Sequence, residues 1–436
     1  MKKAFGTTAR KTASLKSSSG ETITDRSKQM EQWAEHYKNF YLRENVVTET
    51  AINSISSLPD IEELDNSPTE EKFSKAIDSL AHSKAPGNDS IPAEVLHIAG
   101  KAFARVALKR SQQLADRVYP EYQCGFRAQR STIDMIFTVR QLQEKCREQK
   151  QALYIAFIDL PKAFDLVRRK GLFRRLEKIG CPPKLLSVIS SFHDDMQGTV
   201  QFDGSSSAPF LIKSGVKQGC NLAPTLFGIF FSLLLSPTFK LFKLVRLRAK
   251  TSLKASHSEA GLQRLTTCLA HACSEFGLTI SLKKINVIGQ DVSQAPRITI
   301  GDHTLEVVEE FTYLGSTIAS NLSLDAETRK HACQRGETWT AYARQERRLN
   351  SFHLRCLRRI SGSSWQDRVP TTEVLEKANT QSKFVMLSHR RLRWLGHVRR
   401  MEDGRLTKDV LYGELSAGSR PAGRPMLRFK ACARGT

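Results

Sequence analysis

Several features that would define a protein class are missing from this chain of 436 residues. The nine cysteines form no Cys-x-x-Cys pair and their total is odd, which favours a reducing compartment over a disulfide framework. The pattern Cys268-x-x-His271-x-Cys273 has no second ligand couple nearby, so we expect helix residues there and no zinc site. The most apolar run, residues 222–235, is shorter than the roughly 18 residues that a membrane-spanning helix needs. We therefore predict no membrane segment.

Aspartate is absent from residues 204–290. Glu259 and Glu275 are the only carboxylates in that interval, and both lie in segments with helical periodicity. No pair of neighbouring carboxylates can therefore come from this stretch. Acids are also missing before Glu21, where the chain is basic and rich in Ser and Thr. We expect a disordered leader there, although the composition weakly resembles a transit peptide.

The charge of the chain is strongly basic. It has 67 Lys and Arg against 44 Asp and Glu, a net charge of +23, which favours a polyanionic partner. Residues 341–436 hold 21 basic and 8 acidic side chains, so +13 of the +23 lies there, whereas residues 41–71 carry eight acids and one Arg. The alternative interpretation of the basic region is a solvated helix surface without a ligand.

Hydrophobic periodicity predicts a mixed architecture. Helices are expected over residues 25–43, 69–82 and 259–276, and an apolar strand over residues 153–160, followed by a turn and a helix up to Gly180. Residues 200–204 and 245–249 favour a hairpin and a strand. The acidic stretch up to residue 68 is typical of a linker. Together these segments predict a mixture of helices and strands.

Six segments with distinctive sequences follow one another in a fixed order. They are Ser83-Lys84-Ala85-Pro86-Gly87 with Ile91-Pro92-Ala93-Glu94, Gln123-Cys124-Gly125-Phe126-Arg127 with Arg130-Ser131-Thr132, Phe157-Ile158-Asp159-Leu160 with Ala163-Phe164-Asp165, residues 215–224, residues 277–284, and Phe311-Thr312-Tyr313-Leu314-Gly315. Each segment alone is a weak signal. Their collinearity resembles the reverse transcriptase domain of a non-LTR (LINE-like) retrotransposon, and residues 390–397 resemble the tail that follows this domain in such elements.

The resemblance implies an α+β fold, in which helices pack on an antiparallel sheet. It also implies three parts: an N-terminal leader, helix and acidic linker over residues 1–68, a fingers and palm region over 69–320, and a thumb remnant with a basic, mostly helical tail over 321–436. It also implies a reaction. Such an enzyme copies an RNA template by joining a DNA primer 3′-hydroxyl to a nucleotide, using two Mg²⁺ ions held by carboxylates from two palm segments. An intracellular location, nuclear or cytoplasmic, follows from the same resemblance.

The resemblance assigns a role to Asp159, Phe164 and the pair Gln218 and Gly219. Asp159 would bind both Mg²⁺ ions, since a carboxylate is the hard oxygen ligand that Mg²⁺ requires. Phe164 would exclude the ribose 2′-hydroxyl. Gly219 beside Gln218 would let the backbone approach the incoming nucleotide. The alternatives are a turn former at a strand end for Asp159, a core aromatic for Phe164, and a turn before a helix for Gln218 and Gly219.

Four further residues receive a role in the same way. Arg127 and Arg130 would face the triphosphate or the template, because a guanidinium suits phosphate geometry. Lys284 would be the general acid that protonates the leaving pyrophosphate, with Lys283 beside it as a competitor. Tyr313 would grip the primer strand. The alternatives are solvated charges for the two arginines, a surface lysine for Lys284, and an ordinary hairpin around Tyr313.

Departures from the family pattern decide the functional prediction. The chain looks internally shortened near residues 99–104, 250–256 and 328–336. The second of these places is where the family has a β-hairpin with two adjacent aspartates, which is the second palm segment that supplies carboxylates to the metal ions. We therefore predict a reverse-transcriptase remnant that binds nucleic acid without polymerising. One alternative is an active polymerase completed by another carboxylate, such as Asp165 or Glu259. Another is an unstable product without a fixed fold.

The basic tail carries a separate prediction. Arginines at positions 390, 391, 393, 399 and 400 surround Trp394, which predicts electrostatic binding of nucleic acid. Trp394 would either stack on a base or lie, with Leu395 and Val398, in the buried stripe of a helix.

Overall fold

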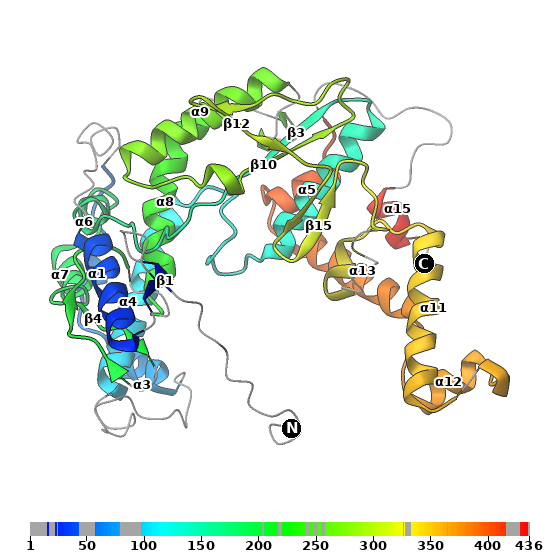
Figure 1. Cartoon of the computed structure of the whole chain (residues 1–436), viewed down its shortest axis with the longest axis horizontal. Coiled ribbons are helices and arrows are strands. Elements are labelled where there is room, and N and C mark those ends of the chain that lie inside the picture. Colours follow the sequence, from blue (N-terminus) through cyan, green and yellow to red (C-terminus); the bar gives the residue numbers. More distant parts are fainter. Residues whose placement is uncertain are drawn as a thin grey trace. The chain divides into compact units, whose positions relative to one another are not determined.

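The structure is a computed structural model of the chain. It describes residues 15–16, 22–23, 25–42, 57–78, 97–202, 205–216, 220–240, 245–246, 252–253, 258–325, 327, 333–363, 365–415 and 428–434. The chain divides into two compact units (Figure 1). Unit 1 comprises Met1–Arg117, Lys162–Phe230 and Glu275–Leu278, and unit 2 comprises Val118–Pro161, Phe231–Ser274 and Thr279–Thr436. The divisions at residues 68 and 320 remain a prediction.

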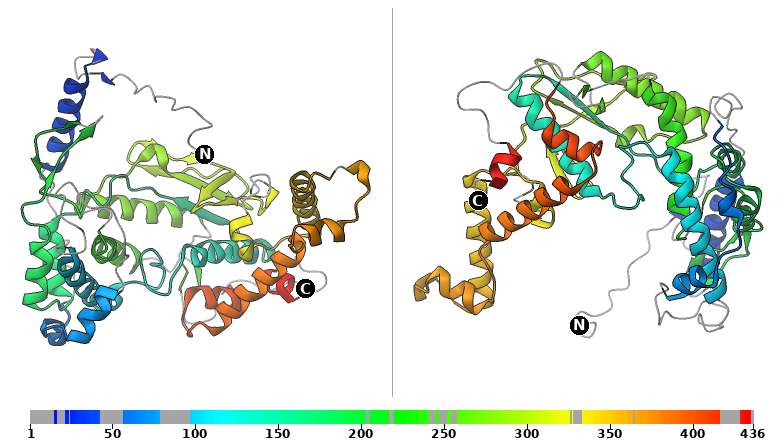
Figure 2. Two further views of the ribbon diagram at one scale, coloured as in Figure 1. Left: turned by 90° about the horizontal axis from the view of Figure 1, so that it is seen from below. Right: turned by 180° about the vertical axis from the view of Figure 1, so that it is seen from behind.

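Unit 1 is mainly helical. Its elements are α1 (Arg26–Leu42), η1 (Glu62–Asp65), α3 (Glu70–Asp78), most of α4 (His97–Val118), α6 (Arg169–Lys178), α7 (Pro183–Ser191), the start of α8 (Ala223–Lys240), and the small antiparallel pairs β1 (Leu15–Lys16) with β2 (Thr22–Ile23), β4 (Gln197–Gly198) with β7 (Phe210–Leu211) and β5 (Gln201–Phe202) with β6 (Ser205–Ser206). Figure 2 shows α1 lying along the green strands β5 and β7. Tyr41 of α1 stacks on Phe210 with ring centroids 6.5 Å apart.

The main sheet of unit 2 has the order β13 (Glu306–Val307), β10 (Asn286–Gln290), β3 (Leu153–Phe157). β10 runs antiparallel to β3, with Asn286 opposite Phe157, and parallel to β13. Because side chains alternate along a strand, Tyr154 and Ala156 of β3 face one side of the sheet. There they pack in the cluster that contains Leu262 of α9 (Glu259–Glu275).

The opposite face of this sheet is covered by α5 (Thr132–Glu148) and by the hairpin of β14 (Glu310–Tyr313) and β15 (Ser316–Ala319), as Figure 1 shows. Phe157 of β3 stacks on Phe311 of β14 with ring centroids 4.3 Å apart. Leu314 and Gly315 have φ values of 50° and 80°, which suit a tight two-residue hairpin turn. The strand that ends before Asp159 is therefore held between α9 on one side and α5 with this hairpin on the other.

The C-terminal region of unit 2 is helical. It contains η3 (Cys333–Thr338), α11 (Ala343–Ile360), η4 (Trp365–Asp367), α12 (Thr371–Lys377), α13 (Lys383–Arg400), α14 (Leu406–Tyr412) and α15 (Phe429–Arg434). Trp394 of α13 is buried against Phe137 of α5 in a cluster that also holds Phe429 of α15. The interpretation of Trp394 as part of a buried stripe is confirmed, and the base-stacking alternative is wrong because the ring is 8% exposed.

The predicted α+β class is confirmed as a mixture of helices and small, mostly antiparallel sheets. The predicted helices at residues 25–43, 69–82 and 259–276 correspond to α1, α3 and α9. The predicted strand at 153–160 ends earlier, at Phe157, and the following helix begins at Arg169, because residues 161–166 form turns. The small pairs β11 (Thr299–Ile300) with β12 (His303–Thr304), and β8 (Val245–Arg246) with β9 (Ser252–Leu253), complete the strands. No described helix has the length and apolar composition needed to cross a membrane.

Candidate functional site

Two of the predicted site residues, Asp159 and Lys284, lie together in unit 2. The antiparallel pairing of β3 with β10 brings the segment after β3 beside η2 (Leu282–Lys284), which precedes β10. Lys284 Nζ lies 3.5 Å from Asp159 Oδ2, and the Ser281 amide donates to the Asp159 carbonyl at 3.4 Å. Sequence reasoning named both residues but not their ion pair.

The donor set around Asp159 does not fit two Mg²⁺ ions. Mg²⁺ requires near-octahedral oxygen ligands at about 2.0–2.1 Å, and a two-metal site shares several carboxylates. Asp159 instead faces an ammonium group, and the sequence supplies no aspartate over residues 204–290. Among the described residues, no group of three or more His, Cys, Asp and Glu side chains is placed to hold a metal ion.

The two carboxylates considered as substitutes have partners of their own. Asp165, in unit 1, accepts a hydrogen bond from the Tyr41 hydroxyl at 3.4 Å, and burial raises the pKa of its carboxyl group. Glu259, in unit 2, accepts from the Arg297 amide at 2.9 Å. Each is bound into its local structure, so each would have to leave these partners to serve a metal.

Phe164 belongs to unit 1 and stacks on Phe227 of α8, with ring centroids 4.4 Å apart. The Val216 amide donates to the Phe164 carbonyl at 3.0 Å. Gly215 has a φ of 84°, and a Cβ at this position would lie 2.8 Å from the Asp165 carbonyl oxygen, so the close approach requires glycine. The loop that begins the Gly215 motif is thus anchored on the Phe164 turn. Gln218 and Gly219 lie outside the described residues.

Arg127 and Arg130 are held in the turn-rich segment before α5. Arg130 Nη2 donates to Glu121 Oε2 at 2.7 Å, and its side chain is 9% exposed. Arg127 Nη1 donates to the Pro120 carbonyl at 3.1 Å, while its guanidinium carbon lies 5.7 Å from the Tyr119 ring centroid. These contacts fix the conformation of the segment, and the contact of both arginines with a nucleotide or template remains a prediction.

Tyr313 ends strand β14, next to the hairpin turn. Its ring packs on Phe157 with centroids 5.3 Å apart, and burial raises the pKa of its hydroxyl. The hairpin predicted as the alternative interpretation is confirmed by the pairing of Tyr313 with Ser316. Its role in gripping a primer remains a prediction.

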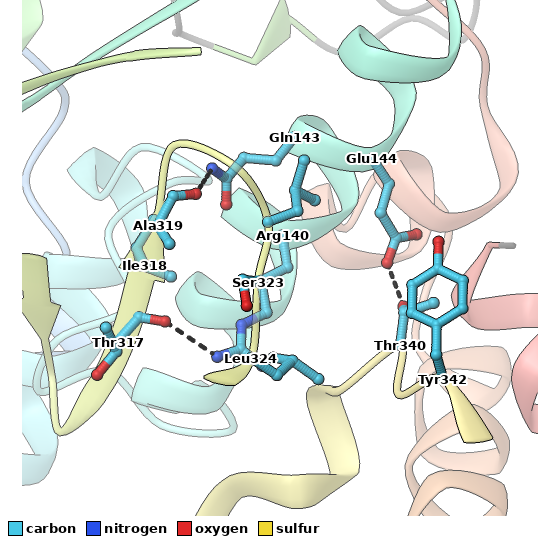
Figure 3. A pocket seen from close by; sticks show the side chains of 11 residues that line it. Arg140, Gln143, Glu144, Thr317, Ile318, Ala319, Ser323, Leu324, Thr340 and Tyr342 are labelled. Atoms are coloured by element: carbon cyan, nitrogen blue, oxygen red, sulfur yellow. Dashed lines mark hydrogen bonds between the residues drawn. The ribbon is translucent and has the colours of Figure 1, made fainter. Parts of the chain in front are cut away.

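Sequence reasoning missed a polar pocket of about 60 Å³ between α5 and β15 (Figure 3). The buried Arg140 of α5 pairs with Glu327 and donates to Ser316 Oγ at 3.0 Å. Gln143, one turn further along α5, donates to the Ala319 carbonyl at 2.9 Å. Both belong to a mainly polar stretch of α5, residues 140–145, in which Leu142 is the one apolar residue, so helical periodicity alone could not place them against β15.

Glu144 lies on the other side of the same pocket. Its carboxylate accepts from the Thr340 hydroxyl (Figure 3), from the Phe429 amide at 3.2 Å and from Gln141 Nε2 at 3.0 Å. Burial raises the pKa of this carboxyl group to about 6, although the three hydrogen bonds oppose the change.

This pKa gives unit 2 an expected dependence of stability on pH. A carboxyl group whose folded-state pKa is raised contributes stability below its unfolded pKa near 4.5, and that contribution is lost as the pH rises through about 6. The loss is on the order of 2 kcal/mol. The free energy of unfolding, measured with urea at pH 4.5 and at pH 7, should lack this contribution of Glu144 in the Glu144→Gln variant. The control Glu402→Gln changes an exposed carboxylate and should keep the same dependence of stability on pH as the unaltered chain. Equal pH profiles for Glu144→Gln and the unaltered chain would contradict the role of Glu144.

Comparison with known proteins identifies the class that this fold and site define. Residues 91–318, just over half of the chain, match the family described as reverse transcriptase (RNA-dependent DNA polymerase). The chain belongs to this family. Its members generally use divalent metal ions, which makes the missing carboxylates at the Asp159 site the main departure.

The similar proteins come from non-LTR retrotransposons. The RNA-directed DNA polymerase from mobile element jockey of Drosophila melanogaster is 27% identical over 250 residues, which cover 53% of this chain and 27% of that protein. Its counterpart from Drosophila funebris is 33% identical over 141 residues, 32% of this chain and 15% of that protein. The Pol polyprotein of a type-1 retrotransposable element R2 from Bradysia coprophila is 27% identical over 141 residues, 31% of this chain and 16% of that protein. This chain thus carries a LINE-like reverse transcriptase domain and spans about a quarter or less of each relative.

Proposed function

We propose that this chain is a retrotransposon-derived reverse transcriptase domain that binds nucleic acid but does not polymerise. The observation that carries the proposal is the donor set at Asp159. Template-directed polymerisation by two Mg²⁺ ions needs carboxylates from two segments, and only one segment supplies a carboxylate here. Losing a metal that stabilises the transition state by several kcal/mol lowers the rate by several orders of magnitude, since each ~1.4 kcal/mol is tenfold.

The same proposal assigns structural elements to the parts of a reverse transcriptase. The sheet β13-β10-β3 with α9 would be the palm, and the helices after residue 320 would be the thumb remnant and basic tail. Arg127, Arg130 and Tyr313 would contact a template and primer if one binds there. An intracellular location, nuclear or cytoplasmic, fits a chain whose partner is nucleic acid.

The distribution of exposed cations supports nucleic-acid binding. Exposed arginines project from two helices of the C-terminal region, at positions 344, 347, 355 and 359 on α11 and at 393, 399 and 400 on α13. Such a surface attracts the phosphate backbone of a nucleic acid, and binding releases the counterions that surround the phosphates. The basic tail is therefore the region of the chain with the strongest electrostatic attraction for a polyanion.

The expected result is a steep dependence of affinity on salt. If three to four phosphates are neutralised, the affinity for a labelled single-stranded oligonucleotide should fall by about 20- to 50-fold between 50 and 200 mM salt. Fluorescence anisotropy of the whole chain measures this. The Arg393→Gln, Arg400→Gln double variant should show a shallower slope, whereas Lys75→Gln on α3 should not. A salt-independent affinity would contradict the proposal.

A further inference from the structure

Two neighbouring hollows of unit 2 meet at the ring of Tyr412, at the end of α14. The first, of about 710 Å³, is lined by Leu392, Leu395, Gly396, Arg399, Lys408, Tyr412 and Lys430. The second, of about 440 Å³, shares Tyr412 and Lys430 and continues to Gln141 and Lys145 of α5. Both volumes fall in the range of roughly 300–1,000 Å³ found for small-molecule sites. We call the two hollows together the Tyr412 groove.

The first hollow combines an apolar floor with an aromatic ring. Leu392 and Tyr412 are 44% and 42% exposed, so both side chains are accessible from solvent. Gly396 of α13 also lines the hollow and adds no side chain to it. The ammonium of Lys430 lies 4.6 Å from the centroid of the Tyr412 ring. Since this cation lies over one face of the ring, a planar ligand that carries a negative charge can stack on the opposite face.

The rim of the first hollow is cationic. Arg399, Lys408 and Lys430 line it, and no acidic side chain does. The side chain of Lys408 is 22% exposed, and its Nζ lies 2.7 Å from Asp403 and donates to the Met401 carbonyl at 2.7 Å. Its charge is therefore partly compensated, and a phosphate that binds there competes with Asp403. Within the described part of the chain, Arg399 has no ion-pair partner.

The second hollow adds little free charge. Lys145, Arg428 and Glu414 line it. Arg428 pairs with both Glu414 and Glu148, whereas Lys145 is 2% exposed and donates to the Gly413 carbonyl. These cations are engaged within the protein, so the cationic rim of the groove is that of the first hollow.

We propose that the Tyr412 groove binds single-stranded nucleic acid, with one base stacked on Tyr412 and the flanking phosphates held by Arg399, Lys408 and Lys430. This inference rests on the proposed function and assigns that binding to a site and a strand type. A single strand exposes its bases to an aromatic ring, whereas a duplex buries them and offers mainly phosphates to the rim.

Charge complementarity selects this occupant over a segment of the chain itself. Residues 416–427, which join α14 to α15 in the sequence, contain Arg420 and Arg424 and no acid. Their charge has the same sign as the rim, so electrostatic attraction does not favour them as occupants. An acidic single strand satisfies both the aromatic floor and the cationic rim.

The test compares oligonucleotide binding by the whole chain and by Tyr412→Ala. Fluorescence anisotropy with a labelled 15-nucleotide oligo(U) strand should show at least a fivefold loss of affinity for Tyr412→Ala, because one base stack is worth about 1–3 kcal/mol, or roughly 5- to 150-fold. Tyr412→Phe keeps the ring and should bind as the unaltered chain does. Affinity for a duplex of equal length should change less than twofold.

Phe384→Ala is the matched control, since Phe384 of α13 is an exposed aromatic residue, 45% exposed, that does not line the groove. It should bind oligo(U) like the unaltered chain. Equal affinities for Tyr412→Ala and Phe384→Ala would overturn the site while leaving the proposed function intact. Absence of binding by the unaltered chain would overturn both. A Tyr412→Ala loss that is as large for the duplex would overturn the preference for single strands.

Discussion

Arg391→Ala is expected to lower the free energy of unfolding by about 3–5 kcal/mol. The Arg391 side chain is 1% exposed and joins three helices. Its guanidinium pairs with Glu346 of α11, donates to Cys432 Sγ of α15 at 2.6 Å, and donates to the Leu387 carbonyl of its own helix at 3.3 Å. Removing the cation leaves the Glu346 carboxylate in a largely buried position without its partner, which costs far more than the loss of an exposed ion pair.

The matched control is Arg393→Ala, two residues further along α13 and exposed, which should change stability by about 0.5 kcal/mol or less. Urea unfolding followed by tryptophan fluorescence measures both, because Trp339 and Trp394 are buried in the same unit. The Arg391→Met, Glu346→Leu double variant should recover most of the loss, since it removes both charges together. Equal midpoints for Arg391→Ala and Arg393→Ala would contradict the expected role of the pair.

The same experiment addresses the alternative of an unstable product. A cooperative transition in the unaltered chain would show a fixed fold, since packed cores unfold in concert. A gradual, non-cooperative loss of signal would favour the alternative. The buried polar connections at Arg391 and Arg140 specify a particular packing of helices, and a chain without a fixed fold would not respond to their removal.

Local sequence patterns predicted much of the fold. Helices α1, α3 and α9 follow from apolar spacing, and a hairpin was the alternative interpretation of the segment around Tyr313. The buried stripe of Trp394 was also predictable, because its neighbours repeat with the helical period. In each case the information lies within one short segment.

Contacts between distant segments were not predictable in the same way. The pairing of Asp159 with Lys284 depends on the register of β3 with β10, which no local pattern encodes. The buried Arg140 and Glu144 look like ordinary polar residues of a helix until β15 and Thr340 are placed against them. The Tyr412 groove likewise needs α13, α14 and α15 together.

The predicted loss of polymerisation is the largest functional effect expected for this chain. The charge and the number of oxygen donors at Asp159 are the reason. Asp159 is one carboxylate, its side chain is 53% exposed, and the ammonium of Lys284 lies 3.5 Å from it, so an incoming cation must compete with an existing positive charge. The second carboxylate segment is missing from the sequence over residues 204–290. A rate lower by several orders of magnitude follows when the metal that activates the 3′-hydroxyl has no site.

Asp159→Asn tests the predicted loss of polymerisation with little expected effect on stability. The Asp159–Lys284 pair is solvent-exposed, so its loss should change the free energy of unfolding by about 1 kcal/mol or less. A difference in activity between the two proteins would therefore report on chemistry, and equal urea midpoints would verify that both are folded.

The most direct measurement is primer extension on an RNA template, first with Mg²⁺ and then with Mn²⁺, by the purified chain and by Asp159→Asn. An active reverse transcriptase in the same buffer verifies the template and primer. We expect no extended product from either protein, while both still bind the template. Extension by the unaltered chain that Asp159→Asn abolishes would show that another carboxylate completes the metal site, and would contradict the central claim.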